Sequence, residues 1–215
     1  TALNRSGRAL WYPPTEKLKV VEVDSFPTLG QLTAFRFIEW VLRNPGGVIA
    51  LPTGKSPEHF IKWVTRILER WETKEVQSLL EGYGVDGSRR PDMKSLAFVQ
   101  IDEFYPMDAT QFNSFYWYVN EFYINGFGLH PENALLIDAT NLGVPPGMTM
   151  AEVFPNNIVD LSLRVRQTRT LLEMRQRETI NRVDEFCSEY ERQIRGASAA
   201  GSHSSATASA ASVTG

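Results

Sequence analysis

The clearest information about the fold lies in the sequence VIALPTGKSP, residues 48–57. Its first four residues form a short apolar run, which is typical of strands buried on both faces of a parallel sheet. Proline and glycine then interrupt the run, and apolar residues recur at helical spacing from Phe60 to Trp71. We therefore predict a buried strand, a tight loop and an amphipathic helix in this order.

Strands and helices are predicted to alternate on both sides of this stretch. Such alternation favours an α/β fold with a doubly wound, mostly parallel sheet and helices on both of its faces. The aromatic run 112–123 has a helical period, and its rings are expected to belong to the core rather than to stack on nucleic-acid bases. The other predicted elements are strands at 18–23, 96–101 and 135–138, a helix capped by Thr28, and helices at 75–81 and 171–195.

The composition divides the chain into three parts. We expect an N-terminal extension over residues 1–17 and one α/β domain over residues 18–196. Residues 197–215 contain only Ala, Ser, Gly, Thr, one His and one Val. Such a segment buries too little apolar area to offset the entropy of ordering, so it is predicted to be a linker or a disordered tail.

Charge and cysteine content exclude several classes of protein. The 215 residues carry a net charge of -3, which excludes a globally basic nucleic-acid-binding protein. A single cysteine, Cys187, excludes an intramolecular disulfide framework and a multi-cysteine zinc site, and the three histidines form no pair of metal ligands four residues apart. No apolar run approaches the roughly 18 residues of a membrane span, so we expect a cytoplasmic protein.

The loop after the first buried strand is a candidate anion site. Gly54 allows the backbone to approach a ligand closely, Thr53 and Ser56 offer hydroxyl groups, and Lys55 adds a positive charge. Amide groups at the start of the following helix favour an anion such as a phosphate. The GxxxxGK[ST] spacing of a P-loop is absent. The alternative is a simple turn in which Ser56 caps the helix and Pro57 is its first residue.

Two acidic residues, Asp102 and Glu103, directly follow the predicted strand that ends at Ile101. Enzymes with parallel sheets keep their active sites at the carboxyl ends of the strands. A carboxylate there can remove a proton from a carbon next to a carbonyl group. The alternative is that these acids only begin a loop or cap a helix.

Side chains of the last third of the chain have simpler interpretations. Arg164, Arg166 and Arg169 are within reach of an anion, but a solvated face is the favoured interpretation. Cys187 falls on the apolar side of the long predicted helix, where we expect a packed and inert thiol.

Four segments carry a resemblance to a known family. They are LPTGKSP at 51–57, IDEFYP at 101–106, FNSFYWYVNEFY at 112–123 and GLHPENALLIDA at 128–139. In order and spacing they resemble the glucosamine-6-phosphate deaminase (isomerase) family, which shares its fold with the 6-phosphogluconolactonases. The resemblance covers roughly residues 18–195. The segment at 154–167 looks like a longer-form branch of the family, and the segment at 178–195 looks like the helix that precedes the family's catalytic glycine-rich loop.

The resemblance implies a reaction and a set of site residues. The family converts glucosamine 6-phosphate to fructose 6-phosphate and ammonia, an isomerisation coupled to a hydrolytic deamination, without a metal or cofactor. Asp102 matches the acid that moves a proton between C2 and C1 of the sugar, with Glu103 as a neighbouring support. Thr53, Gly54 and Ser56 would help hold the sugar phosphate. Lys55 stands where many members of the family have a small residue, so it either adds charge to the phosphate site or points to solvent.

The chain departs from the family after Arg195. There the family continues with a strand and a glycine-rich loop that supplies a further carboxylate and a histidine, whereas here the low-complexity segment follows. We therefore expect a sheet truncated on its C-terminal side, whose open edge is covered by a second copy of the chain or by another partner. Two alternatives to the deaminase stay open. One is a catalytically inactive relative that acts as a binding or structural module in an assembly, and the other is a 6-phosphogluconolactonase-like hydrolase.

Overall fold

The computed structural model describes residues 20–200, and it describes the side chains of residues 20–196. Two compact units meet in the sequence at Thr140 and Asn141, inside the domain predicted over residues 18–196. The predicted extension at 1–17 and most of the predicted tail, 201–215, lie outside the described residues.

The first unit is built on a parallel sheet of three strands. They are β1 (Val48–Ile49), β2 (Ala97–Val99) and β3 (Ala134–Leu135), and they lie side by side in the order β1-β2-β3. Both neighbouring pairs are parallel, with Ile49 opposite Phe98 and Phe98 opposite Ala134. The α/β fold class is therefore confirmed, although each strand is shorter than its apolar run in the sequence.

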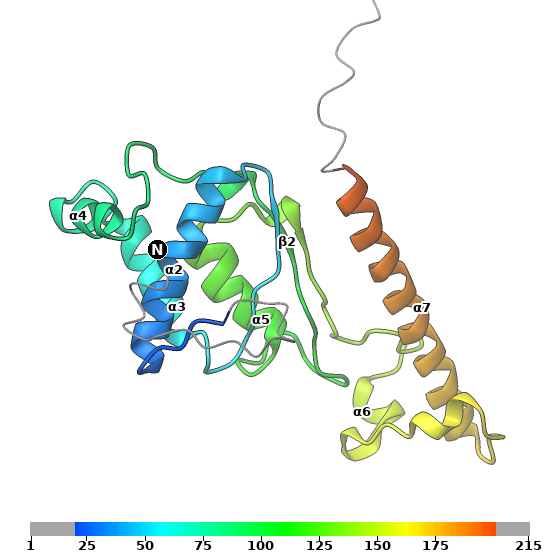
Figure 1. The fold of residues 1–215 in the computed structure, drawn as a ribbon. Helices are drawn as coiled ribbons and strands as arrows, with labels where there is room; N and C mark the ends of the chain where they lie inside the picture. Colours follow the sequence, from blue (N-terminus) through cyan, green and yellow to red (C-terminus); the bar gives the residue numbers. More distant parts are fainter. Residues whose placement is uncertain (1–19, 201–215) are drawn as a thin grey trace, which may run out of the picture. The chain divides into compact units, whose positions relative to one another are not determined.

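Helices connect the strands of this unit, and Figure 1 shows three of them, α2, α3 and α5, on one side of β2. The aromatic segment begins as an α-helix and continues as a π-helix, so its helical period is confirmed. The bounds are α2 Phe26–Arg43, α3 Glu58–Glu69, α4 Lys74–Gly82, η1 Met93–Ser95, α5 Phe115–Val119, the π-helix η2 Asn120–Asn125 and η3 Pro131–Asn133.

The core of the first unit joins one face of the sheet to α2, α3 and the aromatic segment. Phe98 is 1% exposed, and Tyr123 of the aromatic segment is fully buried beside it, with ring centroids 5.9 Å apart. Helices α2 and α3 cross at Gly30, where a Cβ atom would lie 2.5 Å from the Cβ of His59. The absence of a side chain at this position therefore lets the two helices approach closely.

The structure corrects the prediction at the start of this unit. Residues 20–23 are not in a strand, and Val20 is half exposed. Their β-branched composition is not sufficient, because strand propensity reflects packing on a sheet more than an intrinsic backbone preference. The cap of α2 is Ser25 rather than Thr28, since the Ser25 hydroxyl accepts the N–H of Thr28 at 3.4 Å.

The second unit is helical in its described part, 141–200. A capping box between Thr149 and Glu152 begins its first helix. Gly143 has a φ of +75° and approaches the carbonyl oxygen of Thr179 so closely that a Cβ would lie 2.7 Å from it. This close approach joins the start of the unit to its long helix. The bounds are α6 Met150–Val153, η4 Pro155–Asn157, η5 Leu161–Arg164 and α7 Leu171–Ala200.

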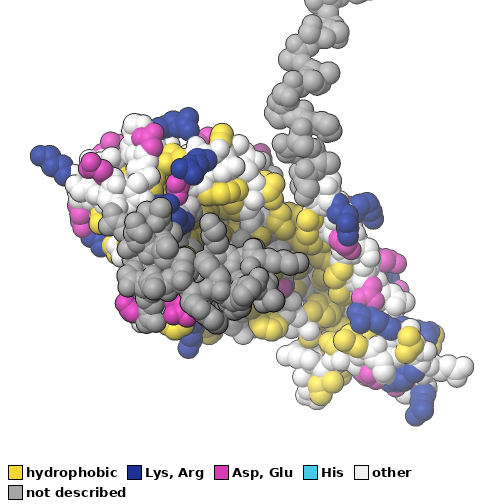
Figure 2. Space-filling view, viewed as in Figure 1, with side chains coloured by type: hydrophobic (Ala, Val, Ile, Leu, Met, Phe, Trp, Pro, Cys, Tyr) yellow, Lys and Arg dark blue, Asp and Glu magenta, His cyan; other side chains and the backbone are white. Residues whose placement is uncertain are grey.

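The exposed side chains of the second unit include one that was predicted to be packed. Cys187 is exposed, not packed. Figure 2 shows apolar side chains interspersed with charged ones on the visible face of this unit. The exposed large apolar residues are Ile158, Leu161, Val165, Leu171, Leu172 and Met174. No helix within residues 20–200 is long and apolar enough to cross a bilayer.

Candidate functional site

The loop after β1 has the backbone of a ligand-binding turn. Gly54 adopts a φ of +89°, which L-residues rarely adopt, and no atom lies within 4 Å of where its Cβ would be. A glycine is therefore required at position 54 by the backbone turn, and not by close packing against a neighbour. Helix α3 begins at Glu58 with Pro57 as its N-cap, and no side chain caps it. The alternative in which Ser56 caps the helix and Pro57 is its first residue is therefore not formed.

The side chains of this loop are available to a ligand. Lys55 and Ser56 are exposed and Thr53 is half-buried. Within the described residues, none of these three side chains makes a hydrogen bond or an ion pair. Two hydroxyl groups and one ammonium group thus lie beside an uncapped helix N-terminus, which is a combination suited to an anion.

The parallel register relates this loop to Asp102. Ile49 of β1 lies opposite Phe98 of β2. Thr53 follows Ile49 by four residues, and Asp102 follows Phe98 by four residues. Because the two strands are parallel neighbours, both residues emerge at the same edge of the sheet.

Asp102 and Glu103 differ in what their carboxylates contact. Asp102 is exposed, and no group in the described part of the chain hydrogen-bonds to its carboxylate. In contrast, the carboxylate of Glu103 accepts hydrogen bonds from the hydroxyl of Ser114 at 2.8 Å and from the backbone N–H of Tyr116 at 2.7 Å. It also accepts from the N–H groups of Phe104 and Phe115. Glu103 therefore caps α5, whereas the Asp102 carboxylate has no such partners among the described residues.

A residue that the sequence reasoning missed holds the backbone at Asp102. Gln100 is 1% exposed, and its side-chain nitrogen donates to the backbone oxygen of Asp102 at 2.9 Å. The amide oxygen of Gln100 accepts the N–H of Ile137 at 2.9 Å. One buried amide thus links the end of β2 to the chain after β3. A glutamine inside an otherwise apolar strand was the signal in the sequence.

The aromatic segment 112–123 makes hydrogen bonds to the backbone of the candidate loop. The hydroxyl of Tyr118 donates to the backbone oxygen of Gly54 at 2.8 Å, and the hydroxyl of Tyr123 donates to that of Pro52. The prediction that these aromatics form core is confirmed for Tyr123, which is fully buried. The segment therefore packs the core and also contacts the loop, through two hydroxyl groups.

The pKa values near the site follow from burial and from local charge. Burial raises the pKa of Tyr105, which follows the acidic pair, to about 12. Burial and the charge of Glu58 raise the pKa of Tyr118 above its ordinary value. The hydrogen bond from Lys62 lowers the pKa of Glu58. Both tyrosine hydroxyls therefore keep their protons at neutral pH, and the Glu58 carboxylate is ionised.

Surface depressions also occur elsewhere on the first unit. One of about 450 Å³ is lined by residues that include Glu39, Arg43, Asp86 and Arg89. Another of about 400 Å³ is lined by residues that include Asp92 and Lys94. These two residues precede β2, so this depression lies at the end of the strand opposite to Asp102. Among residues 20–200, no three His, Cys, Asp or Glu side chains are grouped in a way that would hold a metal ion.

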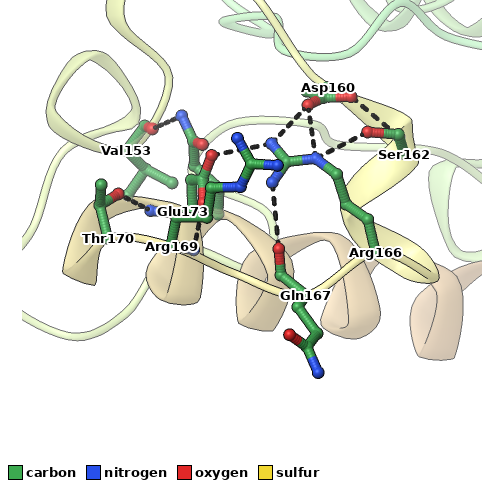
Figure 3. Close-up of polar contacts among 9 residues, drawn as sticks. Val153, Asp160, Ser162, Arg166, Gln167, Arg169, Thr170 and Glu173 are labelled. Carbon is green, nitrogen blue, oxygen red and sulfur yellow. Dashed lines mark hydrogen bonds and ion pairs between the residues drawn. The ribbon is translucent and has the colours of Figure 1, made fainter.

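The arginines of the second unit are engaged in ion pairs. Figure 3 shows the guanidinium of Arg166 between Asp160 and Glu173, with its Nη2 atom 2.8 Å from an oxygen of each. Hydrogen bonds from Ser162 and then from Arg166 lower the pKa of Asp160 to about 2. Hydrogen bonds from Arg166 and then from the backbone N–H of Arg169 lower the pKa of Glu173 to about 2. Arg164 makes two hydrogen bonds to Asp184, at 2.6 and 2.8 Å. Two of the three arginines considered for an anion thus bind carboxylates within the unit.

Comparisons with known proteins give a partial likeness to a solved structure. Neither a protein-family model nor a curated protein sequence matches the chain. A solved structure of a monomeric glucosamine-6-phosphate deaminase, described as a missing link of the NagB superfamily, is similar with a TM-score of 0.43 and 19% identity. The match covers 57% of this chain and 43% of that one, so this chain spans less than half of that enzyme. Any assignment of function therefore has to rest on the residues described above.

Proposed function

We propose that the edge of the sheet formed by residues 52–57 and 100–104 binds a phosphorylated amino sugar and promotes its isomerisation and deamination. In this proposal the substrate is glucosamine 6-phosphate and the products are fructose 6-phosphate and ammonia. The observation that carries the proposal is the register of β1 and β2, in which Thr53 and Asp102 follow paired residues by the same four positions.

The phosphate end of the proposal is supported by the loop after β1. The hydroxyls of Thr53 and Ser56 would donate hydrogen bonds to phosphate oxygens, and Lys55 would add a positive charge. The N-terminus of α3, which no side chain caps, adds backbone N–H groups and the positive end of the helix dipole. These features suit a phosphate ester better than a neutral ligand.

The chemical step is assigned to Asp102. In the open-chain sugar, its carboxylate removes the proton on C2 and returns it to C1, through an enediol-type intermediate that carries the amino group. The resulting C2 imine reacts with water, which releases ammonia and leaves the C2 ketone of fructose 6-phosphate. Support comes from the contrast between two carboxylates. The Asp102 carboxylate accepts no hydrogen bond from the described residues, whereas the Glu103 carboxylate accepts hydrogen bonds from four donors.

An ammonia-release assay with the full chain tests this proposal. We expect ammonia to form from glucosamine 6-phosphate, and we expect Asp102→Asn to abolish its formation while the protein stays folded. Asp86→Asn, at another aspartate of the first unit, is the matched control and should keep full activity. Normal turnover by Asp102→Asn would exclude the role given to this residue.

The same samples separate the two alternatives that the sequence leaves open. Binding of glucosamine 6-phosphate without ammonia release would indicate a binding module rather than an enzyme. Hydrolysis of 6-phosphogluconolactone in place of deamination would indicate the lactonase reaction. Chromatography with light scattering measures whether the chain associates with a second copy of itself.

A further inference from the structure

We propose that the hydroxyl groups of Tyr118 and Tyr123 position the loop 52–56 so that its backbone N–H groups face a phosphate ester. This inference rests on the function proposed above and names two positioning residues for it. Neither tyrosine is assigned contact with the substrate itself. The two hydrogen bonds that they donate, to the oxygens of Gly54 and Pro52, join residues that are 64 and 71 positions apart in the sequence.

The geometry of the peptide unit fixes where the N–H groups of this loop point. The peptide bonds after Pro52 and Gly54 are trans. In a planar trans peptide the C=O and N–H bonds point in opposite directions. Because the oxygen of Pro52 points at Tyr123, the N–H of Thr53 points away from that ring. For the same reason, the N–H of Lys55 points away from Tyr118.

The partial charges of the loop backbone also bear on phosphate binding. Both carbonyl oxygens carry partial negative charge, which would repel a phosphate if they faced it. Each tyrosine hydroxyl engages one of these oxygens on the side of the aromatic segment, while two N–H donors face the other way. Backbone N–H groups that gather on one side of a turn form an anion-binding concavity. The φ of +89° at Gly54 provides the turn between the two peptide units.

Both tyrosine donors are held by ring packing. Tyr123 is fully buried, and its ring lies against Phe98 and Phe127 with centroids 5.9 and 5.3 Å away. Tyr118 packs on Phe122 with ring centroids 4.6 Å apart. These contacts leave each hydroxyl little freedom to move, so the loop is held against a fixed part of the core.

Substitution to phenylalanine isolates the two hydroxyl groups, because it keeps the packed rings. The variants are Tyr118→Phe, Tyr123→Phe and the double variant. The matched control is Tyr116→Phe, whose hydroxyl makes no hydrogen bond within the described residues although the residue lies on the same helix. Circular dichroism and urea unfolding establish that each variant is folded.

The measurement is a titration with inorganic phosphate and then with glucosamine 6-phosphate, monitored by calorimetry and by backbone amide NMR. We expect each single variant to weaken phosphate binding by about fivefold and the double variant by more than tenfold, which corresponds to about 1 kcal/mol per hydrogen bond. The amide signals of Thr53 and Lys55 should shift most in the wild type. In turnover, KM should rise with little change in kcat, because binding and not proton transfer is affected.

The outcomes distinguish this inference from the proposed function. Phosphate binding that is equally tight in the wild type and the double variant overturns the positioning role alone. Absence of phosphate binding by the wild type overturns the proposed function and this inference together. Equal weakening by Tyr116→Phe would assign the effect to general loosening of the helix and would also overturn the positioning role.

Discussion

The buried side chain of Gln100 donates a hydrogen bond to the backbone oxygen of Asp102, 2.9 Å away, and accepts one from the N–H of Ile137. Asp102 is exposed, so its own side chain does not fix its position. The proposed catalytic carboxylate is thus held through its backbone by a neighbour two residues earlier. This arrangement lets the side chain of Asp102 stay free while its main chain is fixed.

Replacing Gln100 by leucine should reduce turnover without removing the carboxylate. Leucine keeps most of the volume but leaves the oxygen of Asp102 and the N–H of Ile137 without this partner, which we expect to cost about 2 kcal/mol of unfolding free energy. Ammonia release and urea unfolding of Gln100→Leu measure both effects. The exposed Gln111 offers the control Gln111→Leu. Wild-type kcat in Gln100→Leu would contradict the positioning of Asp102 by this amide.

Glu103 is expected to matter for stability more than for chemistry. The change Glu103→Gln removes the charge and leaves one acceptor oxygen where four donors now converge. Hydrogen bonds to a charged acceptor contribute about 1.5–3 kcal/mol, so we expect a loss of about 2 kcal/mol in urea unfolding. Glu121→Gln, at an exposed position in the following π-helix, should be nearly neutral. If Glu103→Gln lost activity at unchanged stability, Glu103 would belong to the reaction and not to the cap.

The contact at Gly30 predicts a strong effect far from the site. In Gly30→Ala the new Cβ would lie 2.5 Å from the Cβ of His59 and 2.7 Å from the backbone nitrogen of Phe60. Helix α2 would have to move away from α3, and overpacking of this kind costs about 1–3 kcal/mol. Thermal unfolding measures the loss. Gly84→Ala tests a different glycine whose Cβ would meet open space but whose φ is +70°, so its loss should come from backbone strain alone and be smaller.

The ion pairs of Arg166 predict an acid-sensitive second unit. Asp160 and Glu173 have pKa values of about 2 in the folded chain, below the ordinary values of 3.8 and 4.5. Carboxyl groups with lowered pKa values stabilise the fold above their ordinary pKa, and this contribution is lost as the pH falls toward 2. The NMR signals of residues 160–175 should therefore change between about pH 4.5 and pH 2.

Arg166→Gln provides the comparison for this acid transition. Without the guanidinium group, both carboxyl groups should titrate closer to their ordinary pKa values, and the transition should move to higher pH. Lys74→Gln, at an unrelated exposed residue, controls for the loss of one positive charge. An acid transition at the same pH in the wild type and in Arg166→Gln would show that these pairs do not stabilise the unit.

The central strands and helices could be predicted because their signals are local. The run 48–51 and the helical spacing after Pro57 are properties of neighbouring residues, and β1 and α3 are formed there. The ends of the helices and strands were less predictable. Ser25 and Thr28 are both good caps by residue type, and only the fold selects Ser25. The run at 20–23 has strand composition without strand structure.

The roles of individual site residues depend on contacts distant in the sequence. Asp102 and Glu103 are chemically alike, and their difference arises because α5 begins beside Glu103 alone. The contact between Tyr118 and Gly54 spans 64 residues, so no local pattern contains it. Cys187 was predicted to be packed from its place on a helix, but burial depends on what that helix contacts.

The central claim is that the loop after β1 and Asp102 form one site for a phosphorylated amino sugar. Backbone amide NMR of the full chain, titrated with glucosamine 6-phosphate, tests it most directly. The account predicts saturable shifts that grow together at residues 53–58 and 102–104, with one shared dissociation constant. Shifts confined to the depression lined by Arg43 and Arg89, or the absence of shifts at either predicted segment, would contradict it.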